Sequence, residues 1–431
     1  MRSILIVGAG QAGLQLALGL QARGYDVTVM TSRTAEEIRA GRVMSTQCMF
    51  ASALAVERGL GLDFWASQAP EVGGLGVSVT APDGTRAVDW LGRLEGVAQS
   101  VDQRLKMAGW LEAFAERGGR VVVHAVAVSD LDWFSRAYDL CLVAAGKGDL
   151  VSAFGRSVTR SPYTAPQRAL AVAYVHGLEP RPEHPDLAAV RCNLVPGVGE
   201  LFVIPALTTS GPCDILFWEA LPGGPADVFQ SVRDPGEHLR LTLELMARYV
   251  PWEHARAARV ELTDAGGTLS GRYAPVVRRP VAELPSGGLA LGVADVVVAN
   301  DPVTGQGSNN AARCADVYLR AITDRGDLPF DREWMQSAFD AYWAVAEPSV
   351  KWTNAMLAPP PEHVLGLIGA ASELPPVADR FAGGFNDPAD FEEWFFEPER
   401  AAAYLDRLRA EGPDAARVPT PRAEPDQAPA P

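Results

Sequence analysis

The chain has 431 residues, a formal net charge of −15 and a hydrophobic fraction of 48%. This length predicts about two or three domains, and the hydrophobic fraction excludes disorder of the whole chain. The acidic balance argues against nucleic acid or an anionic membrane as a partner, because polyanions are bound by basic surfaces.

Other compositional features point to a cytoplasmic protein without a metal site. No apolar run reaches the roughly 18 residues of a membrane span, and the apolar run at residues 4–7 is too short for a signal-peptide core. The five cysteines include no Cys-x-x-Cys pair, and the six histidines show no ligand spacing. Reduced thiols and no bound metal are therefore expected.

The N-terminus predicts a dinucleotide site. The apolar run at 4–7 reads as a buried parallel strand, the sequence GAGQAG follows at 8–13, and a helix to Arg23 leads into a second strand at 25–30. The three glycines permit a tight turn, the approach of a pyrophosphate and close packing of the helix on the strand. The helix N-terminus offers its N–H groups and positive dipole end to phosphate.

The end of the second strand argues against free NAD. NAD-type sites usually place a carboxylate there for the ribose hydroxyls, whereas this chain has Thr31-Ser32-Arg33. The two hydroxyls can still bond a ribose, and the arginine can cover the adenine or a phosphate.

The next segments continue the same sheet. Strands are predicted over 118–123 and 138–146, and the second of them ends in small residues that fit beneath a cofactor. The helix predicted over 101–117 contains Arg104, which is either a pyrophosphate ligand or a solvated helix charge. From Arg168 the pattern changes to antiparallel strands, which are followed by a helix over 236–249.

A second dinucleotide element lies about 280 residues after the first. An apolar strand ends at Gly292, Asp295 follows, and a Gly-Gln-Gly turn at 305–307 precedes a helix that opens near Ser308. Asp295 suits the ribitol hydroxyls of FAD, and the helix dipole suits the negative charge of reduced flavin. Taken alone, the aspartate could be a turn carboxylate and the turn an ordinary loop; together, the two elements specify FAD.

These patterns predict an α/β fold with a Rossmann-like FAD-binding domain of the glutathione-reductase type, an inserted β-rich substrate domain and a C-terminal helical region. The expected boundaries are 1–69, 98–165 and 271–330 for the FAD-binding domain, 70–97 and 166–270 for the substrate-binding domain, 331–410 for the helical region and 411–431 for a disordered tail.

Seven stretches, in order along residues 1 to about 405, carry a specific resemblance. They are IVGAGQAGL at 6–14, SP at 161–162, PQRAL at 166–170, DPVTGQGSN at 301–309, KWTN at 351–354, FNDP at 385–388 and PER at 398–400. In these the chain resembles the oxygenase component of two-component styrene and indole monooxygenases, which are group E flavoprotein monooxygenases.

The resemblance implies a reaction, partners and an assembly. A separate NAD(P)H-dependent flavin reductase would supply reduced FAD by diffusion, and O₂ would convert it to a C4a-hydroperoxide that epoxidises a small apolar alkene or aromatic such as styrene or indole. This chemistry needs a dry, apolar, orienting pocket rather than a general base. A homodimer and a weakly held flavin are further expectations from the family.

The resemblance also assigns residues. Ser45, Thr46, Gln47 and Pro302 would lie near the reactive edge of the flavin. The residues expected to hold FAD are Gly8, Gly10, Gln11, Ala12, Gly13, Thr31, Ser32, Arg33, Arg42, Arg104, Val126, Gly146, Asp295, Gly305, Gln306, Gly307, Ser308 and Asn309.

The chain departs from the family pattern at two places. Ser45 follows Val43-Met44 where the family has asparagine, which changes the hydrogen bond expected beside the peroxide. The sequence VGGLGV at 72–77 replaces bulkier residues, including aromatics and a histidine, and therefore predicts room for alkenes larger than styrene.

Three other functions stay open from the sequence. A single-component aromatic hydroxylase would bind NAD(P)H itself. A flavin-dependent halogenase is less favoured, because no Trp-x-Trp-x-Ile-Pro stretch or catalytic lysine segment is evident. A flavin-binding protein without catalytic activity would share the same FAD elements.

Overall fold

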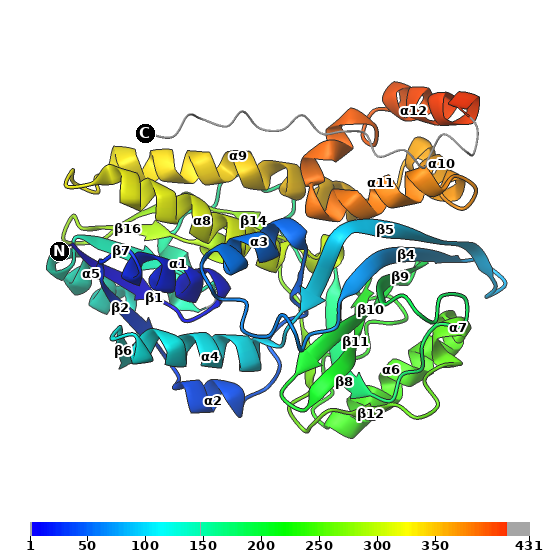
Figure 1. The fold of residues 1–431 in the computed structure, drawn as a ribbon, viewed down its shortest axis with the longest axis horizontal. Helices are drawn as coiled ribbons and strands as arrows, with labels where there is room; N and C mark the ends of the chain where they lie inside the picture. Colours follow the sequence, from blue (N-terminus) through cyan, green and yellow to red (C-terminus); the bar gives the residue numbers. More distant parts are fainter. Residues whose placement is uncertain (1, 147, 412–431) are drawn as a thin grey trace.

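The computed structural model describes residues 2–146 and 148–411, in which two large sheets lie side by side and a layer of helices runs along one edge of both (Figure 1). A third, two-stranded sheet pairs β14 (Val276–Val277) with β17 (Val298–Ala299). The α/β fold class expected from the sequence is confirmed. Of the predicted tail, residues 412–431 lie outside the described residues, and Glu411 is the last residue of helix α12 (Pro398–Glu411).

The first sheet has six strands in the order β15-β16-β7-β1-β2-β6. Only the pairing of β15 with β16 is antiparallel, so the carboxyl ends of the other strands meet at one edge, where α/β folds bind ligands. Its strands are β1 (Ser3–Val7), β2 (Asp26–Thr31), β6 (Arg120–Val123), β7 (Leu140–Val143), β15 (Val281–Glu283) and β16 (Leu289–Gly292).

The helices of this half bury the sheet. Helix α1 packs against both α4 and α8, and its whole stretch from residue 11 to residue 20 is buried because it runs between the sheet and these two helices. The helices are α1 (Gln11–Gln21), α2 (Ala35–Arg39), α3 (Ala51–Gly59), α4 (Gln103–Glu116), α5 (Val128–Ala137) and α8 (Gly307–Arg325).

The second sheet has nine strands and unites two separate parts of the chain. Strand β4 pairs in parallel with β9, which joins the β4–β5 hairpin to the meander β8–β11. The strands are β3 (Cys48–Met49), β4 (Val72–Thr80), β5 (Arg86–Ser100), β8 (Ala169–His176), β9 (Ala189–Val195), β10 (Gly199–Thr208), β11 (Gly211–Ala220), β12 (Glu261–Leu262) and β13 (Thr268–Gly271). Helices α6 (Pro235–Tyr249) and α7 (Pro251–His254) lie on its outer side (Figure 1).

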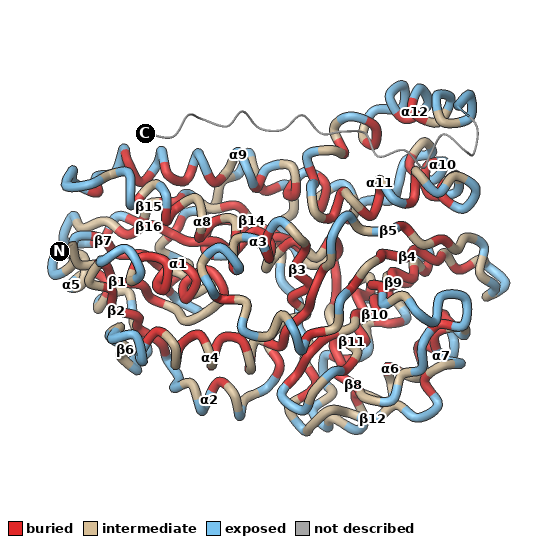
Figure 2. Tube along the Cα trace, in the orientation of Figure 1, coloured by how far each residue is buried: buried red, intermediate tan, exposed pale blue. Residues whose placement is uncertain are grey.

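The C-terminal helices tie the two halves together. Helix α9 (Arg332–Met356) packs on α8, and helix α11 (Pro375–Asn386) packs on β5. Between them Trp352 stacks on Phe391 with ring centroids 4.5 Å apart and meets Phe385 edge-on. Figure 2 shows that the facing sides of these helices are buried and their outer sides exposed. Helix α10 (Glu362–Ala370) completes the layer.

None of the helices within residues 2–146 and 148–411 combines the length and the apolarity needed to cross a bilayer.

The contact between β5 and α11 predicts a position that tolerates only glycine. A Cβ on Gly92 would lie 2.0 Å from the carbonyl oxygen of Ala378, and a backbone atom cannot move aside cheaply. We expect Gly92→Ala to destabilise the protein by about 2–4 kcal/mol and to lower the melting temperature measured by circular dichroism.

Gly383→Ala is the matched control, because Gly383 lies on the same α11 and a Cβ there meets nothing within 4 Å. Alanine is the better helix former, so this variant should be neutral or more stable by up to about 1 kcal/mol. Equal melting temperatures for the two variants would contradict the close packing of β5 on α11.

Candidate active site

A cavity of about 1050 Å³ extends from the carboxyl edge of the six-stranded sheet to the inner face of the nine-stranded sheet. Its first half is lined by residues that follow β1, β2 and β7 directly, and its second half by side chains of β4, β9, β10 and β11. The cavity therefore joins the predicted dinucleotide site to an apolar chamber in the other sheet.

The glycine turn after β1 shapes the first half. Gly8 has φ +118°, which only glycine adopts easily. A Cβ on Gly13 would lie 2.2 Å from the Gly8 carbonyl oxygen, so the helix can pack this close to the turn only with glycine at this position. Gly10 is the N-cap of α1 and a Cβ there would meet nothing within 4 Å, because it would project into open space beside the cavity.

The start of helix α1 suits an anion. Its N-cap makes no side-chain hydrogen bond, and its first turn contains no acidic residue. The free N–H groups and the positive end of the helix dipole therefore face the cavity, which is the arrangement that binds pyrophosphate. These features fit the FAD predicted from the sequence.

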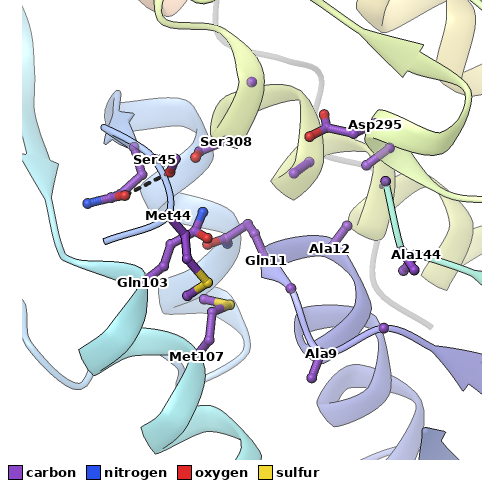
Figure 3. A pocket seen from close by; sticks show the side chains of 18 of the residues that line it. Ala9, Gln11, Ala12, Met44, Ser45, Gln103, Met107, Ala144, Asp295 and Ser308 are labelled. Carbon is purple, nitrogen blue, oxygen red and sulfur yellow. Dashed lines mark hydrogen bonds between the residues drawn. The ribbon is translucent and has the colours of Figure 1, made fainter. Parts of the chain in front are cut away.

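Asp295 lies on the same side of the cavity as Ala12 and Ala144 (Figure 3). Met44 and Ser45 lie on the opposite side. The preceding Ala294 has φ +50°, and its N–H donates to the Cys314 sulfur at 3.3 Å. A non-glycine residue in the left-handed region is strained, and such strain is common where a side chain must be aimed at a ligand.

The segment 45–47 is held by a ring of hydrogen bonds. The Ser45 hydroxyl donates to Gln47 Oε1 at 2.8 Å, Gln47 Nε2 donates to the Tyr174 hydroxyl at 2.9 Å, and that hydroxyl donates to the Ser45 carbonyl oxygen at 2.7 Å. Burial raises the pKa of Tyr174 well above its usual value, so the phenol keeps the proton that closes the ring. Tyr174 is buried in β8, and the sequence carried no motif that singled it out.

The structure brings most of the predicted site residues to this one cavity. Those on its lining are Gly8, Gly10, Gln11, Ala12, Thr31, Ser32, Arg33, Ser45, Thr46, Gln47, Val126, Gly146, Asp295, Pro302, Gly305, Gly307 and Ser308. Gln103 and Met107 of α4 line it as well and were not predicted; Figure 3 shows both beside Gln11 and Met44.

Five predicted residues are not on the lining. The Arg104 guanidinium is buried between Asp102 and Asp264, at 2.8 and 2.9 Å, and Arg42 lines a different cavity. Gly13 lies beneath the glycine turn. Gln306 Nε2 donates to the Phe385 carbonyl oxygen, and Asn309 Oδ1 accepts from the Phe50 N–H, so both amides hold loops together behind the cavity wall.

The second half of the cavity has an apolar wall. Phe202 and Ile204 stand two residues apart on β10, so both point to the same face of the sheet. The remaining apolar side chains of this wall are Val43, Leu75, Val190, Phe217, Leu269 and Phe385. The sequence predicted antiparallel strands in this region, but nothing there showed which face of β10 meets the flavin site.

The glycine-rich stretch in β4 does not open the cavity in the way its sequence predicted. Leu75 lines the cavity, whereas a Cβ on Gly76 would run into the side chain of Arg191, and one on Gly74 into Leu91 and the backbone of Gly92. Successive side chains of a strand alternate between faces, so these two glycines serve the packing on the far side of the sheet.

Two buried acids lie behind the flavin end of the cavity. Burial raises the pKa of the Asp301 carboxyl to about 6. Burial, together with the charge of Asp301, raises the pKa of Glu219 well above its usual value. Within the described residues neither carboxylate oxygen of Glu219 has a hydrogen-bond partner from a donor group, which fits a protonated acid beside Asp301.

We predict that Gly10→Ala separates cofactor binding from folding. The added methyl group fits the backbone of Gly10, which has φ −92°, but it occupies the space that a pyrophosphate needs. Reduced FAD should bind about tenfold more weakly, as measured by anaerobic fluorescence titration, whereas the stability without FAD should fall by less than about 1 kcal/mol. Gly13→Ala should instead lower the melting temperature. Unchanged FAD affinity in Gly10→Ala would place the pyrophosphate elsewhere.

The raised pKa of Asp301 predicts a pH dependence of stability. An unfolded aspartate titrates near pH 3.9, so between about pH 4 and 6 the folded state binds the extra proton and stability is lost as the pH rises. Asp301→Asn keeps the Oδ1 that accepts from the Val303 N–H and removes this proton. Between about pH 4 and 6 this variant should therefore lose less of its free energy of unfolding than the parent, by on the order of 2 kcal/mol, as measured by denaturant titration. Superimposable pH profiles of the variant and the parent would contradict it.

Comparisons by sequence and by structure relate the chain to known proteins. Residues 146–256 match the family model described as "Styrene monooxygenase A putative substrate binding domain". The chain is 31% identical to the styrene monooxygenase StyA of Pseudomonas fluorescens over 94% of its own length and 98% of that protein, and 32% identical to the StyA of a Pseudomonas species over the same shares. Among solved structures it resembles the flavin-dependent brominase Bmp2, with a TM-score of 0.64, 12% identity, and coverage of 95% of this chain and 100% of that one.

Proposed function

This chain belongs to the styrene monooxygenase family and is a flavin-dependent monooxygenase of a two-component system that uses FAD, and from that premise we propose that it epoxidises an apolar alkene. In this proposal a separate NAD(P)H-dependent reductase supplies the FAD already reduced. Reduced FAD and O₂ then provide one oxygen atom to the carbon–carbon double bond, and the other oxygen atom leaves as water.

The observation that carries this proposal is the apolar wall formed by Val43, Leu75, Val190, Phe202, Ile204, Phe217, Leu269 and Phe385. Transfer of an electrophilic oxygen to a double bond requires no base to act on the substrate. It requires exclusion of water and a fixed distance between the double bond and the flavin, and apolar side chains on a rigid sheet supply both. An apolar chamber also recognises its substrate by size and shape rather than by polar groups.

The remaining residues divide between holding the flavin and shaping its reactive edge. We assign the pyrophosphate to the turn at 8–13, the adenosine to 31–33 and Val126, and the ribitol to Asp295. The N-terminus of α8, at Gly307 and Ser308, would stabilise the negative charge of the reduced ring. The ring of hydrogen bonds through Ser45, Gln47 and Tyr174 would keep segment 45–47 in place beside that edge.

Substrate size depends in this proposal on Leu75 and its aliphatic neighbours rather than on the glycines of β4. Leu75→Phe should lower kcat/KM for a bulky aryl alkene by about tenfold and affect styrene less, because the larger ring takes up room at the apolar wall. The measurement is epoxide formation from styrene, indole and a bulkier alkene with chemically reduced FAD, after melting curves have shown that the variant folds. Equal losses of kcat/KM for styrene and for the bulkier alkene in Leu75→Phe would contradict this role of Leu75.

The competing functions give different products and different consumption of nicotinamide. A single-component hydroxylase would oxidise NAD(P)H on its own when substrate is present, whereas this chain should do so only after a flavin reductase is added. The fold shared with a brominase is tested by adding bromide to the same assay. A brominated product in place of the epoxide would favour halogenation.

A further inference from the structure

A second cavity, of about 380 Å³, lies on the outer side of the nine-stranded sheet between α6, β13 and the loop before α6. We call it the Arg42 cleft. Its polar lining comes from Arg42, Arg233, Arg272, His238, Thr268, Ser270, Gln230 and the two acids Asp227 and Asp234. It holds one of the two arginines that the family resemblance assigned to FAD and that the structure places away from the flavin cavity.

The charge in the Arg42 cleft is positive although the chain as a whole carries −15. Within the described residues neither Arg42 nor Arg233 forms an ion pair, and both are exposed at the rim. The two acids of the lining are already engaged, since Asp227 pairs with Arg272 at 3.0 Å and Asp234 caps α6 by accepting from the Glu237 N–H at 2.7 Å. Arg233 Nη1 donates to the carbonyl oxygens of Gln230 and Val232, at 2.9 and 3.0 Å, and its other N–H groups, together with the Arg42 guanidinium, remain available to a ligand.

The floor of the Arg42 cleft contains an unsatisfied polar group. His238 is only 3% exposed, and its Nε2 has no hydrogen-bond partner among the described residues. Its ring lies against Phe229, with centroids 4.6 Å apart, so it cannot turn freely toward solvent. A buried polar atom without a partner is costly, and a ligand that bonds to it recovers that cost.

The hydroxyls of the lining have room for further bonds. Thr268 is buried at the floor and Ser270 is half-buried, and in the described part of the chain neither side chain makes a hydrogen bond to protein. Together with the Arg42 guanidinium and the remaining N–H groups of Arg233, they place several donors around one space. The His238 ring adds no positive charge, because burial lowers its pKa to about 4. A tetrahedral anion with three or four acceptor oxygens fits this set.

We propose that the Arg42 cleft binds a phosphoryl group, either as free inorganic phosphate or as the phosphate of a flavin nucleotide. The proposal goes beyond the oxygenase activity and does not depend on it. Bound phosphate would also restrain the segment beside the flavin, because Val43 follows Arg42 and lines the first cavity, and Leu269 lines both cavities.

The test is isothermal titration of the full-length, FAD-free protein with inorganic phosphate at constant ionic strength. We expect saturable binding by the parent and about tenfold weaker binding by Arg42→Gln and by Arg233→Gln, since each removes a charged donor without disturbing an ion pair. Arg248→Gln is the matched control, because Arg248 is exposed near the other end of α6, does not line the cleft, and contacts the ring of Tyr249. It should bind phosphate like the parent.

A second titration with saturating FAD distinguishes the two sources of the phosphoryl group. Undiminished phosphate binding would identify a site for free phosphate, whereas competition by FAD would identify a flavin phosphate. Absence of saturable binding, or equal binding by the parent, Arg42→Gln and Arg233→Gln, would overturn the proposal. Melting curves without phosphate confirm that each variant is folded. Neither these curves nor the titrations depend on whether the protein proves to be an epoxidase.

Discussion

The close packing of α1 against the end of β1 is the constraint on which the rest of the site depends. A Cβ on Gly13 would lie 2.2 Å from the Gly8 carbonyl oxygen, so only glycine lets the helix begin this near the strand. That approach aims the N-terminus of α1 into the cavity and leaves open space beside Gly10. The parallel pairing of β2 and β7 with β1 brings their ends to the same edge, where Gly146 allows Asp295 to approach.

The second sheet contributes the opposite kind of surface. At the edge of the first sheet, the N–H groups of the α1 N-terminus and the carboxylate of Asp295 line the cavity. The second sheet presents Phe202, Ile204 and Phe217 to the same cavity. The two surfaces are held at a fixed distance because α9 packs on α8 and α11 packs on β5, with Trp352 stacked on Phe391 between them. A polar cofactor cradle facing an apolar chamber is the arrangement that oxygen transfer to an alkene needs.

The sequence predicted those parts of the molecule that depend on local chemistry. The glycine turn, Asp295 and the second Gly-Gln-Gly turn each follow from spacing within a few residues, and all three line one cavity. Long-range packing was not visible in the sequence. The buried Arg104 pairs with Asp264, a residue far along the chain, and Tyr174 reaches segment 45–47 from β8. The glycines of β4 face Arg191 and Gly92 because the register with β5 and β9 decides which side of the strand meets the cavity.

The most direct test of the account is the reaction of the protein's complex with reduced FAD, mixed anaerobically and then with oxygenated buffer in a stopped-flow spectrophotometer. If the apolar chamber keeps water from the activated oxygen, an absorbing species that is neither reduced nor oxidised FAD should persist before oxidised FAD returns. Alkene should shorten its lifetime and yield epoxide. Return of oxidised FAD in one step, at the rate of free reduced FAD and with hydrogen peroxide as the product, would contradict the account.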